Sequence, residues 1–588
     1  MAKYNIVELS VRGTKLVDLY QKREEEKKAL LNQNAIYIYR SSKTKKVYIG
    51  QTVHFVQRHN EHYNGTEIKF NDAHFDQVIV IFSQYFNRSA LDDVESQLIT
   101  YFSADCGNAN GAVSYDSSTI INGNGGNSVN EYKDRGEVAT KVIIPLWEKV
   151  LYPKGWVKTQ TLEKVRTKEL VRYSPIKELS AEQYLLIHEI YNNPQKNYVI
   201  NGDAGTGKTV LLTHLVAYLM TNRPNATIGV IVQPNWEETG QRIFKVFGMN
   251  STRLTVTTST KLISSYGDTH QQYDIIVIDE SHKLSRKYGK QHPSFNSVYS
   301  IPDFHDCESH LEILQKIGGQ IVLMYDVLQA VRPANITRTM FQDLTSGYEK
   351  KFLTTQFRIH ASNGKCYTSE DYINGIKYLL FKDTGLLNST LTNFNPNFNR
   401  DVFKEADPDG YFGYYTELPL HNLFDWIEED RNFHPEHVNR VLAGLVEDWR
   451  QSDGKDPNIY HWFEGDMKCR WNSRQENWIN STEPDAQEQI GSVFSVQGID
   501  LNKVGVLIGD DIKVTPDGKL AAEPSNFKNR NGVFTSEEME DAYTRDEFTL
   551  LVLNCYYVLL TRGIDGIRLG FWRNDDFKDY MEKTLDIK

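Results

Sequence analysis

A glycine-rich segment in the middle of the chain has the residue types that bind a nucleotide phosphate. The segment NGDAGTGKTV fits the spacing GxxxxGKT, in which glycines let backbone N–H groups surround a phosphate at the start of a helix. We expect Lys208 to place its charge on the β- and γ-phosphates of ATP and Thr209 to bind Mg²⁺. The residues expected to form this phosphate loop are Gly202, Asp203, Ala204, Gly205, Thr206, Gly207, Lys208 and Thr209.

Two carboxylates follow an apolar run further along the chain. The segment YDIIVIDESH places Asp279 and Glu280 at the end of a predicted buried strand, where α/β sheets bind their ligands. We expect Asp279 to hold Mg²⁺ through water and Glu280 to polarise the water that attacks the γ-phosphate. Together with the phosphate loop, these carboxylates predict ATP hydrolysis.

A second set of reactive residue types lies near the N-terminus. Tyr37 and Tyr48 fall on two β-rich runs, and Arg58 and His62 are four residues apart, on one face of a predicted helix. Cleavage of a phosphodiester needs an activated water, a cation on the phosphate and neutralisation of the developing charge. Arg58 suits a phosphate oxygen, and Glu95 suits Mg²⁺ or Mn²⁺. These residue types are the ones that such a cleavage needs.

Apolar patterns predict the elements that position these residues. The two β-rich runs flank a polar turn, which is typical of a hairpin carrying Tyr37 and Tyr48. From about residue 180, alternating strand and helix patterns predict a parallel sheet of βα units. Buried parallel strands are expected at 226–232, 273–280, 320–326 and 504–510, and helices at 14–31, 53–62, 89–103 and 210–220. Residues 142–153 either close the N-terminal domain as a helix or lead out of it.

Composition limits the class of protein. The 588 residues are 40% hydrophobic and 24% charged, as in a soluble globular chain of about three or four domains. No apolar window of about 18 residues or secretory signal is evident, so we expect a cytoplasmic protein without a membrane partner. The net charge of −11 does not indicate a basic surface for wrapping nucleic acid, although a groove needs only a local basic lining. Five scattered cysteines argue against a zinc site and disulfides.

Two groups of side chains are expected to be structural. His54 and His59 are expected to face solvent, because no cysteine or carboxylate pattern completes a zinc site around them. Aromatic side chains in the C-terminal third could stack on bases, but residues of this kind are more often in a core. We expect a core position for Trp462, Trp471, Trp478, Tyr556 and Tyr557.

The N-terminal segment AIYIYRSSKTKKVYIGQTVHFVQRHNEHY resembles the GIY-YIG nuclease family. The resemblance implies that Tyr48 or Tyr37 helps to activate water and that Glu95 is the single metal ligand. A tyrosine with a pKa near about 10 needs a neighbour to lower that value, and His62 is a candidate. Ala35 replaces the first glycine of the family pattern. The catalytic residues implied are Tyr37, Tyr48, Arg58, His62, Glu95 and Asn122, the last being open against Asn108, Asn110 and Asn124.

Residues 180–565 resemble superfamily 1 helicases, and especially the helicase half of Schlafen proteins. The resemblance implies that Gln183 reads adenine and that residues 255–262 touch the nucleic-acid backbone. Arg358 and Arg562 would act as arginine fingers from the second lobe. The residues implied to couple nucleotide to nucleic acid are Asp326, Gln329, Gln497, Gly498 and Asp500.

We therefore predict an α/β protein in which a small α+β GIY-YIG domain precedes two RecA-like parallel-sheet lobes. The expected order is an N-terminal helical segment (1–30), the nuclease domain (31–130), a connector (131–174), lobe 1 (175–345) and lobe 2 (346–588). Lobe 2 is expected to carry an insertion at about 395–485.

The predicted function is an ATP-dependent motor that delivers nucleic acid, by expectation DNA, to a nuclease that uses Mg²⁺ or Mn²⁺. Such an architecture suits phage defence, restriction or repair. One alternative is a nucleotide-gated switch that controls the nuclease or a protein partner without movement. RNA as the substrate is a further alternative, and the sequence leaves room for a homo-oligomer.

Overall fold

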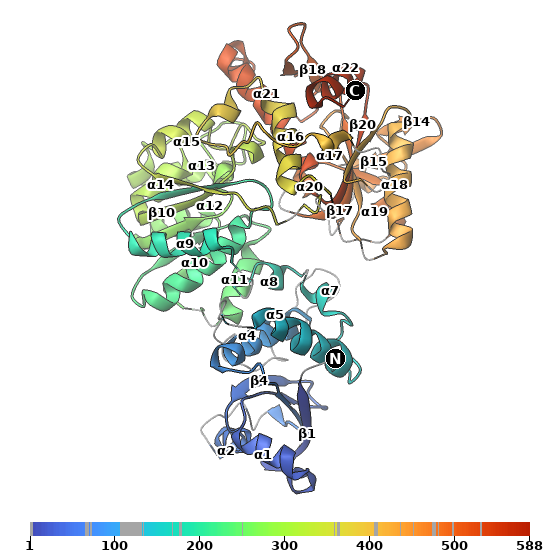
Figure 1. The fold of residues 1–588 in the computed structure, drawn as a ribbon. Coiled ribbons are helices and arrows are strands. Elements are labelled where there is room, and N and C mark those ends of the chain that lie inside the picture. The colour runs from blue at the N-terminus through green and yellow to red at the C-terminus, as the bar shows by residue number, and fades with distance from the viewer. Residues whose placement is uncertain are drawn as a thin grey trace. The chain divides into compact units, whose positions relative to one another are not determined.

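The structure of the protein is a computed structural model in which the chain divides into two compact units (Figure 1). The first unit comprises Met1–Tyr191 with Thr209–Thr257, and the second comprises Asn192–Lys208 with Thr258–Lys588. The structure describes residues 4–587 except 65–69, 71–72, 106–131, 133, 167, 176–178, 248, 250, 358, 362–364, 405–409, 436, 451, 473–477, 480, 482, 497–498 and 530–531.

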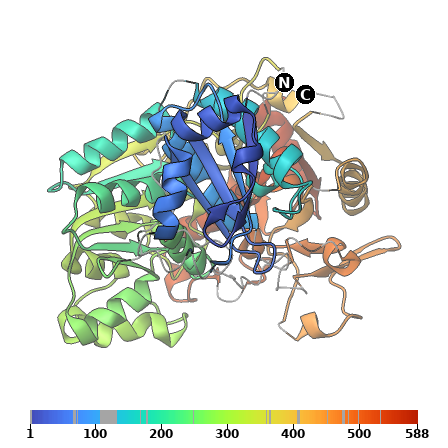
Figure 2. The ribbon, with the colours of Figure 1, turned by 90° about the horizontal axis from the view of Figure 1, so that it is seen from below.

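An antiparallel sheet organises the N-terminal part of the first unit, drawn in blue in Figure 2. Its strand order is β2-β1-β5-β3-β4, and the predicted hairpin is confirmed as β3 paired with β4. Tyr39 lies opposite Tyr48 and Tyr37 lies opposite Gly50, so both predicted tyrosines project from one face. The strands are β1 (Asn5–Arg12), β2 (Lys15–Leu16), β3 (Ala35–Arg40), β4 (Val47–Thr52) and β5 (Gln77–Phe82).

The first thirty residues differ from the helical segment that we expected. Between residues 4 and 32 the structure has one α-helix, α1 (Glu24–Asn32), after a single 3-10 turn at Leu19–Gln21, and β1 pairs antiparallel with β5 as part of the nuclease sheet. The physical reason is the alternation of Val7, Leu9 and Val11, which are all buried on one side of the strand. A boundary at residue 30 would therefore cut through the nuclease fold.

Two apolar cores cover the two faces of this sheet. Tyr37, Tyr39 and Tyr48 pack in one core with residues of α1 and of α2 (Phe55–Asn64). The isoleucines of β3, β4 and β5 pack in the other core, against α4 (Arg88–Asp105). Because successive strand residues point to opposite faces, each face presents its own set of side chains to a separate layer of helices.

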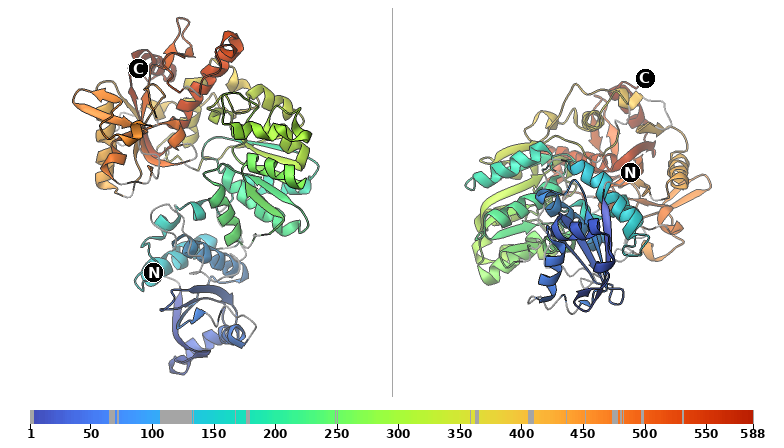
Figure 3. Two further views of the ribbon diagram at one scale, coloured as in Figure 1. Left: turned by 180° about the vertical axis from the view of Figure 1, so that it is seen from behind. Right: turned by 60° about the horizontal axis from the view of Figure 1, so that its bottom comes forward.

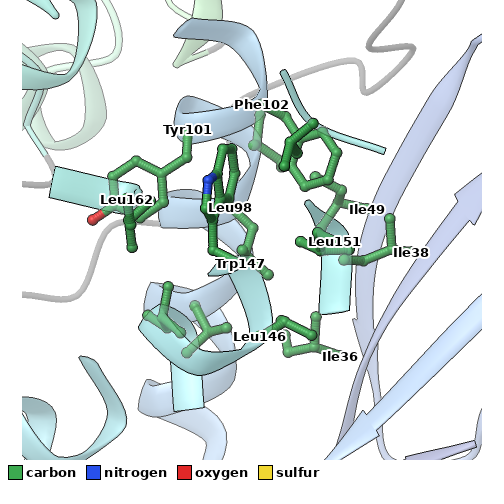
Figure 4. Close-up of a cluster of buried hydrophobic side chains, with 14 of the residues drawn as sticks. Ile36, Ile38, Ile49, Leu98, Tyr101, Phe102, Leu146, Trp147, Leu151 and Leu162 are labelled. Carbon is green, nitrogen blue, oxygen red and sulfur yellow. The ribbon is translucent and has the colours of Figure 1, made fainter. Parts of the chain in front are cut away.

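The predicted connector completes the second core. Residues 135–151 form one helix, here called the connector helix, in which α5 (Arg135–Val138) and α6 (Ile144–Leu146) alternate with π-helical turns at 139–143 and 147–151. Figure 4 shows Trp147 and Leu151 lying with Leu98 of α4 near the isoleucines of the sheet. The helix expected at 142–153 therefore closes the nuclease core instead of leading out of it. Shorter helices α7 (Leu162–Arg166) and α8 (Glu169–Arg172) follow.

The first RecA-like region contains the parallel strands predicted from the apolar runs. In the second unit the strand order is β11-β6-β10-β9, and each neighbouring pair is parallel. In the first unit, β7 and β8 form another parallel pair. The strands are β6 (Tyr198–Gly202), β7 (Ile228–Ile231), β8 (Leu254–Thr257), β9 (Tyr273–Ile278), β10 (Gly318–Tyr325) and β11 (Glu349–Leu353). The main helices are α9 (Ala181–Asn192), α10 (Lys208–Asn222), α11 (Glu237–Val246), α12 (Ser259–Thr269), α14 (His310–Ile317) and α15 (Arg338–Leu344).

A second parallel sheet lies in the C-terminal part of the second unit, drawn in orange and red in Figure 3. Its order is β12-β20-β17-β13-β16-β15-β14, with only the β14–β15 pair antiparallel. Its strands are β12 (Phe412–Tyr415), β13 (Arg440–Ala443), β14 (Trp462–Glu464), β15 (Met467–Trp471), β16 (Gln489–Gly491), β17 (Leu501–Ile508) and β20 (Gly563–Phe571).

The insertion expected at about 395–485 is corrected by this topology. The strands β12, β13 and β15 fall in that range and form part of the lobe's own sheet. Strands of four or five residues are too short to show a clear apolar alternation, so the sequence gives no clear strand pattern in that range.

Helices and buried aromatic rings complete this lobe. The helices are α16 (Ser369–Phe381), α17 (Asp401–Lys404), α18 (Pro419–Phe433), α20 (Val493–Val496), α21 (Ala542–Leu560) and α22 (Asp575–Leu585). The expected core position is confirmed for Trp462, Trp471, Trp478, Tyr556 and Tyr557, all of which are buried. Across the described part of the chain, a search for a helix with the length and hydropathy to span a membrane finds none.

Candidate nucleotide and nuclease sites

The phosphate loop connects β6 to the start of α10. Gly205 and Gly207 have φ angles of 86° and 81°, a region that a side chain disfavours, so the loop needs glycine at both positions. The ammonium of Lys208 donates hydrogen bonds to the carbonyls of Gly202 and Asp203. The hydroxyl of Thr206 also donates to the Asp203 carbonyl, at 2.9 Å. The carbonyls of the loop thus hold the ammonium of Lys208 inside the loop, where its positive charge can bind a phosphate.

The strand order brings the predicted acidic residues to the same edge of the sheet. Because β6, β10 and β9 are adjacent and parallel, their carboxyl ends place Asp326 and Asp279 beside the loop. An oxygen of Asp326 lies 3.8 Å from Nζ of Lys208, and its other contact is the Gln329 side-chain amide, which donates at 2.7 Å. Asp279 is buried and accepts the backbone N–H of Glu280 at 3.0 Å.

Glu280 is held in an electrostatic environment that favours its charged form. Its Oε2 lies 3.0 Å from Nε2 of His282 and 3.2 Å from Nζ of Lys283. Burial acts to raise the pKa of Glu280, but Lys283 and His282 outweigh it and hold that pKa well below its ordinary value. The carboxylate is therefore ionised at neutral pH, as polarising a water requires. His282 and Lys283 were not predicted as site residues, although the segment SHK that contains them directly follows Glu280 in the sequence.

Of the residues predicted to act from the second lobe, the structure describes Arg562 and Asp500. Arg562 is buried, and its guanidinium donates to the carbonyls of Val558 and Ile499, at 3.0 and 3.4 Å. Both carbonyls belong to lobe 2, so Arg562 can act as an arginine finger only if its guanidinium gives up these two hydrogen bonds. Asp500 is partly buried before β17. Arg358, Gln497 and Gly498 lie outside the described residues, as does Asn122 of the nuclease pattern.

Gln183 has a local structural role in α9. Its backbone N–H donates to Oγ of Ser180 at 3.2 Å, and its side-chain oxygen accepts the Ser180 N–H at 3.0 Å. This is the reciprocal pair of a capping box, which satisfies two backbone donors at the helix start. The cap accounts for a glutamine at this position, and adenine recognition by Gln183 remains a prediction.

The nuclease tyrosines lie beside the predicted histidine. The hydroxyl of Tyr37 is 2.8 Å from Nε2 of His62, and the Tyr37 and Tyr48 rings stack with centroids 6.2 Å apart. His62 itself stacks on Phe70 at 4.2 Å. Burial raises the pKa of Tyr37 well above its ordinary value, although Arg58 opposes the shift. Tyr37 is therefore protonated at neutral pH, and His62 is placed to exchange a proton with it.

A second tyrosine–histidine pair lies one turn away and corrects the expectation for His59. That residue is buried, with Nδ1 2.7 Å from the hydroxyl of Tyr39 and Nε2 3.0 Å from the carbonyl of Thr14. Because a carbonyl only accepts, Nε2 carries the proton and Nδ1 accepts from Tyr39. The expectation that His59 faces solvent is wrong, whereas His54 is exposed as expected.

Glu95 lies on α4 next to a residue that the sequence analysis missed. Nε2 of Gln51 donates to Glu95 at 3.1 Å and also to Asp92, one turn earlier on the same helix face. Burial raises the pKa of Glu95 to about 7, against the opposing hydrogen bond from Gln51. The acidic residue three positions before Glu95 was the signal that could have identified Asp92.

The donor set at Glu95 suits a hard cation. Among the described residues, no group of three or more His, Cys, Asp or Glu side chains is placed to hold a metal. Mg²⁺ is commonly bound through one or two carboxylates and several waters, and the oxygens of Glu95 and Asp92 fit that pattern.

Two family models match the parts of the chain that hold these sites. A model described as Schlafen group 3, DNA/RNA helicase domain, matches residues 195–572, and the GIY-YIG catalytic domain model matches residues 33–107. The uncharacterised protein YPL245W of Saccharomyces cerevisiae is 25% identical over 406 residues, which span 63% of this chain and 80% of the relative.

Solved helicase structures are also similar, at low scores. The helicase domain of Hef from Pyrococcus furiosus has 10% identity and a TM-score of 0.30, over 68% of this chain and 96% of that one. Pif1 from a Bacteroides species, in complex with ADP-AlF4, has 12% identity and a TM-score of 0.29, over 70% and 96%. Scores this low add nothing to the two family matches.

Proposed function

Because this chain belongs to the Schlafen group 3 DNA/RNA helicase-domain family and carries a GIY-YIG catalytic domain, we propose that it couples a superfamily 1 motor to a metal-dependent DNA endonuclease. Its two hydrolytic activities follow from those matches: the helicase-like lobes hydrolyse ATP and the nuclease domain hydrolyses phosphodiesters. The finer proposal is that ATP hydrolysis moves nucleic acid toward the nuclease.

One observation carries the ATPase part of the proposal. Lys208, Asp326, Asp279 and Glu280 are gathered by three adjacent parallel strands at one sheet edge, with Lys208 3.8 Å from Asp326. When ATP and Mg²⁺ are bound, Thr209 and Asp279 would hold the metal, which neutralises phosphate charge. The chain itself contributes the cationic Lys208, the ionised Glu280 that orients water, and the loop N–H groups that bind phosphate oxygens.

In the nuclease domain, the chain's own residues divide the work of phosphodiester cleavage. Arg58 binds and neutralises a phosphate oxygen, and Tyr37 or Tyr48 orients the attacking water while His62 takes up a proton. Glu95, with Asp92 beside it, would hold Mg²⁺ or Mn²⁺, which polarises the scissile phosphate.

The second candidate is a nucleotide-gated switch that controls the nuclease without stepping. Asn554 of α21 donates to the carbonyls of Val327 and Ala330, which follow Asp326. Through such a contact, a change in the nucleotide bound to the first lobe can shift the position of α21 in the second lobe without any movement along a nucleic-acid strand. The switch differs from the motor in predicting ATP hydrolysis without movement along a strand.

The decisive experiment offers the purified protein supercoiled, linear and single-stranded DNA, and the corresponding RNA, with Mg²⁺ or Mn²⁺ and with or without ATP. We expect DNA cleavage that Glu95→Ala abolishes and ATP hydrolysis that Lys208→Ala reduces by at least about 100-fold. Strand-displacement and translocation assays then separate motor from switch. Cleavage that survives Glu95→Ala would place the nuclease site elsewhere, and preferential cleavage of RNA would select RNA as the substrate.

A role in phage defence, restriction or repair is the biological setting we propose for a motor joined to a nuclease. We also propose that the protein acts in the cytoplasm on nucleic acid, either alone, as a homo-oligomer or with a protein partner. Loss of resistance to phage or to DNA damage in a strain lacking the protein would test that setting, and resistance restored by Glu95→Ala would contradict it.

A further inference from the structure

The side chain of Asp203, a residue of the phosphate loop, contacts lobe 2. Its Oδ2 lies 2.7 Å from Nζ of Lys377 on α16, and its Oδ1 accepts the hydroxyl of Tyr557 on α21 at 3.3 Å. All of these residues belong to the same compact unit. A residue inside the phosphate loop is therefore held by two helices of the other lobe.

The ion pair with Lys377 stabilises the Asp203 side chain in this position. The lysine is completely buried, with 1% of its side chain exposed, and its ammonium also donates to the carbonyl of Asn393. A buried ammonium is tolerated only when it is paired and hydrogen-bonded, so Asp203 cannot rotate inward without leaving an unpaired buried charge.

The next two residues of the loop are held from the same outer side. The carbonyl of Ala204 accepts from the Gln356 side chain at 2.8 Å, and the carbonyl of Gly205 accepts the Phe357 N–H at 3.0 Å. In a trans peptide the N–H points opposite to the C=O, so fixing the carbonyls of Ala204 and Gly205 also fixes the direction of the N–H groups that follow them. Backbone N–H groups are what such loops use to bind anions.

We propose that Lys377 is a positioning residue of the ATPase site. Through Asp203 it holds the phosphate loop in the conformation that receives ATP, and it does so only while α16 lies against the loop. The assignment rests on the ATPase function proposed above. It makes nucleotide affinity depend on the position of lobe 2, which gives the second lobe a means of controlling ATP binding that does not use an arginine finger.

The test uses the full-length protein with Lys377→Met, Asp203→Asn and the double variant. We measure KM and kcat for ATP, the Kd of a fluorescent ATP analogue, and the melting temperature. Lys377→Met should raise KM and Kd about 10-fold while kcat changes less than about 3-fold, because loop preorganisation affects binding and not the later chemistry. Lys404→Met is the matched control, since Lys404 forms an exposed ion pair with Asp586, and it should change none of these quantities.

The double variant separates positioning from a purely structural ion pair. Asp203→Asn alone strands the buried ammonium and should lower the melting temperature most, whereas the double variant has no unpaired charge and should recover it. We expect KM and Kd to stay raised in the double variant. Recovery of KM together with the melting temperature would overturn the proposal and leave an ion pair of structural importance only.

Two further results have defined meanings. If Lys377→Met does not fold, the double variant carries the test, with the same expected and contrary outcomes. A wild-type protein that binds no nucleotide would overturn the ATPase function and this inference together. A wild-type protein that hydrolyses ATP, with Lys377→Met unchanged in KM and Kd, would overturn this inference alone.

Discussion

At the scale of single residues, Glu95 is the proposed metal ligand of the nuclease and has a raised pKa. Burial raises the pKa of Glu95 to about 7, and Gln51 donates a hydrogen bond that opposes the shift. A proton and a metal ion compete for the same oxygens, so the carboxyl must ionise before it can bind a cation. The nuclease should therefore respond to pH in the range where Glu95 titrates.

We predict that metal-dependent cleavage rises as pH increases from about 6 to 8, because the fraction of ionised Glu95 increases. The midpoint should move to lower pH as the Mg²⁺ concentration increases. Initial cleavage rates across that range measure both effects. Glu95→Gln should remove cleavage at every pH, whereas Glu8→Gln, at an exposed position on β1, should leave the profile unchanged. A midpoint insensitive to metal would contradict the competition.

Arg562 allows a second prediction at this scale. Its guanidinium is anchored by the carbonyls of Val558 and Ile499, so its charge can be retained while its fork geometry is removed. Arg562→Lys should lower kcat for ATP by about 10- to 100-fold and change ATP affinity by less than about 3-fold, because a finger acts in the transition state. Steady-state kinetics and nucleotide titration measure the two. Loss of affinity alone would argue against a finger.

At the scale of elements, hydrogen bonds between side chains of β3 and α2 orient the side chains of the nuclease domain. Tyr39 bonds to His59 and Tyr37 to His62, so two alternate residues of the strand, which face the same side, each hold a histidine, and the two histidines are one turn apart on the helix. His59 also donates to Thr14, which ties α2 to the loop after β1. The helix that carries Arg58 is thus oriented by a buried polar ladder, in which the Tyr39–His59 pair has no proposed part in the chemistry.

We predict that His59→Ala destabilises the first unit by about 1–3 kcal/mol, since it leaves the Tyr39 hydroxyl and the Thr14 carbonyl without their partner. His54→Ala, the matched control on the same segment, should change stability by less than about 0.5 kcal/mol because that side chain is exposed. Urea unfolding monitored by protease susceptibility of the N-terminal unit compares them. Equal destabilisation by His59→Ala and His54→Ala would contradict the proposal that the buried His59 contacts orient α2.

At the scale of the whole molecule, the connector belongs to the fold of the nuclease. Trp147 and Leu151 of the connector helix pack against α4, and Ile243 and Phe247 at the end of α11 join the same buried cluster. The nuclease core therefore includes side chains from the first RecA-like region. The expected limit between the lobes at residue 345 is corrected by β11 (Glu349–Leu353), which pairs with β6 in the first parallel sheet. We propose to end lobe 1 after β11 and to extend the nuclease unit through the connector helix.

We predict that Trp147→Ala destabilises the first unit by about 3–5 kcal/mol through the cavity it creates. Cleavage activity should be lost at a lower temperature than in the wild type, and ATP hydrolysis should be lost with it, because the first unit also contains Thr209 and most of α10. Tyr152→Ala, in the same segment at a position 37% exposed, is the control and should have little effect. Nuclease and ATPase activities measured after heating at a series of temperatures test this. Loss of cleavage with ATP hydrolysis intact would contradict this expectation and show that the nuclease core unfolds separately from α10.

Local patterns in the sequence determined much of this molecule. The glycines and lysine of the phosphate loop, the strand that ends at Asp279 and the helical spacing of Arg58 and His62 are all encoded within short segments. For the same reason the β3–β4 hairpin and the parallel strands could be predicted, since apolar periodicity reports which face of an element is buried.

Only the tertiary structure decided which distant residues meet. The burial of His59 against Thr14, the pairing of β1 with β5 and the ion pair between Asp203 and Lys377 join residues that are far apart in the chain. No spacing rule reports such contacts, because they depend on how whole elements pack and not on the period of any one of them. The reactive groups were visible in the sequence, whereas the contacts that orient them emerged from packing.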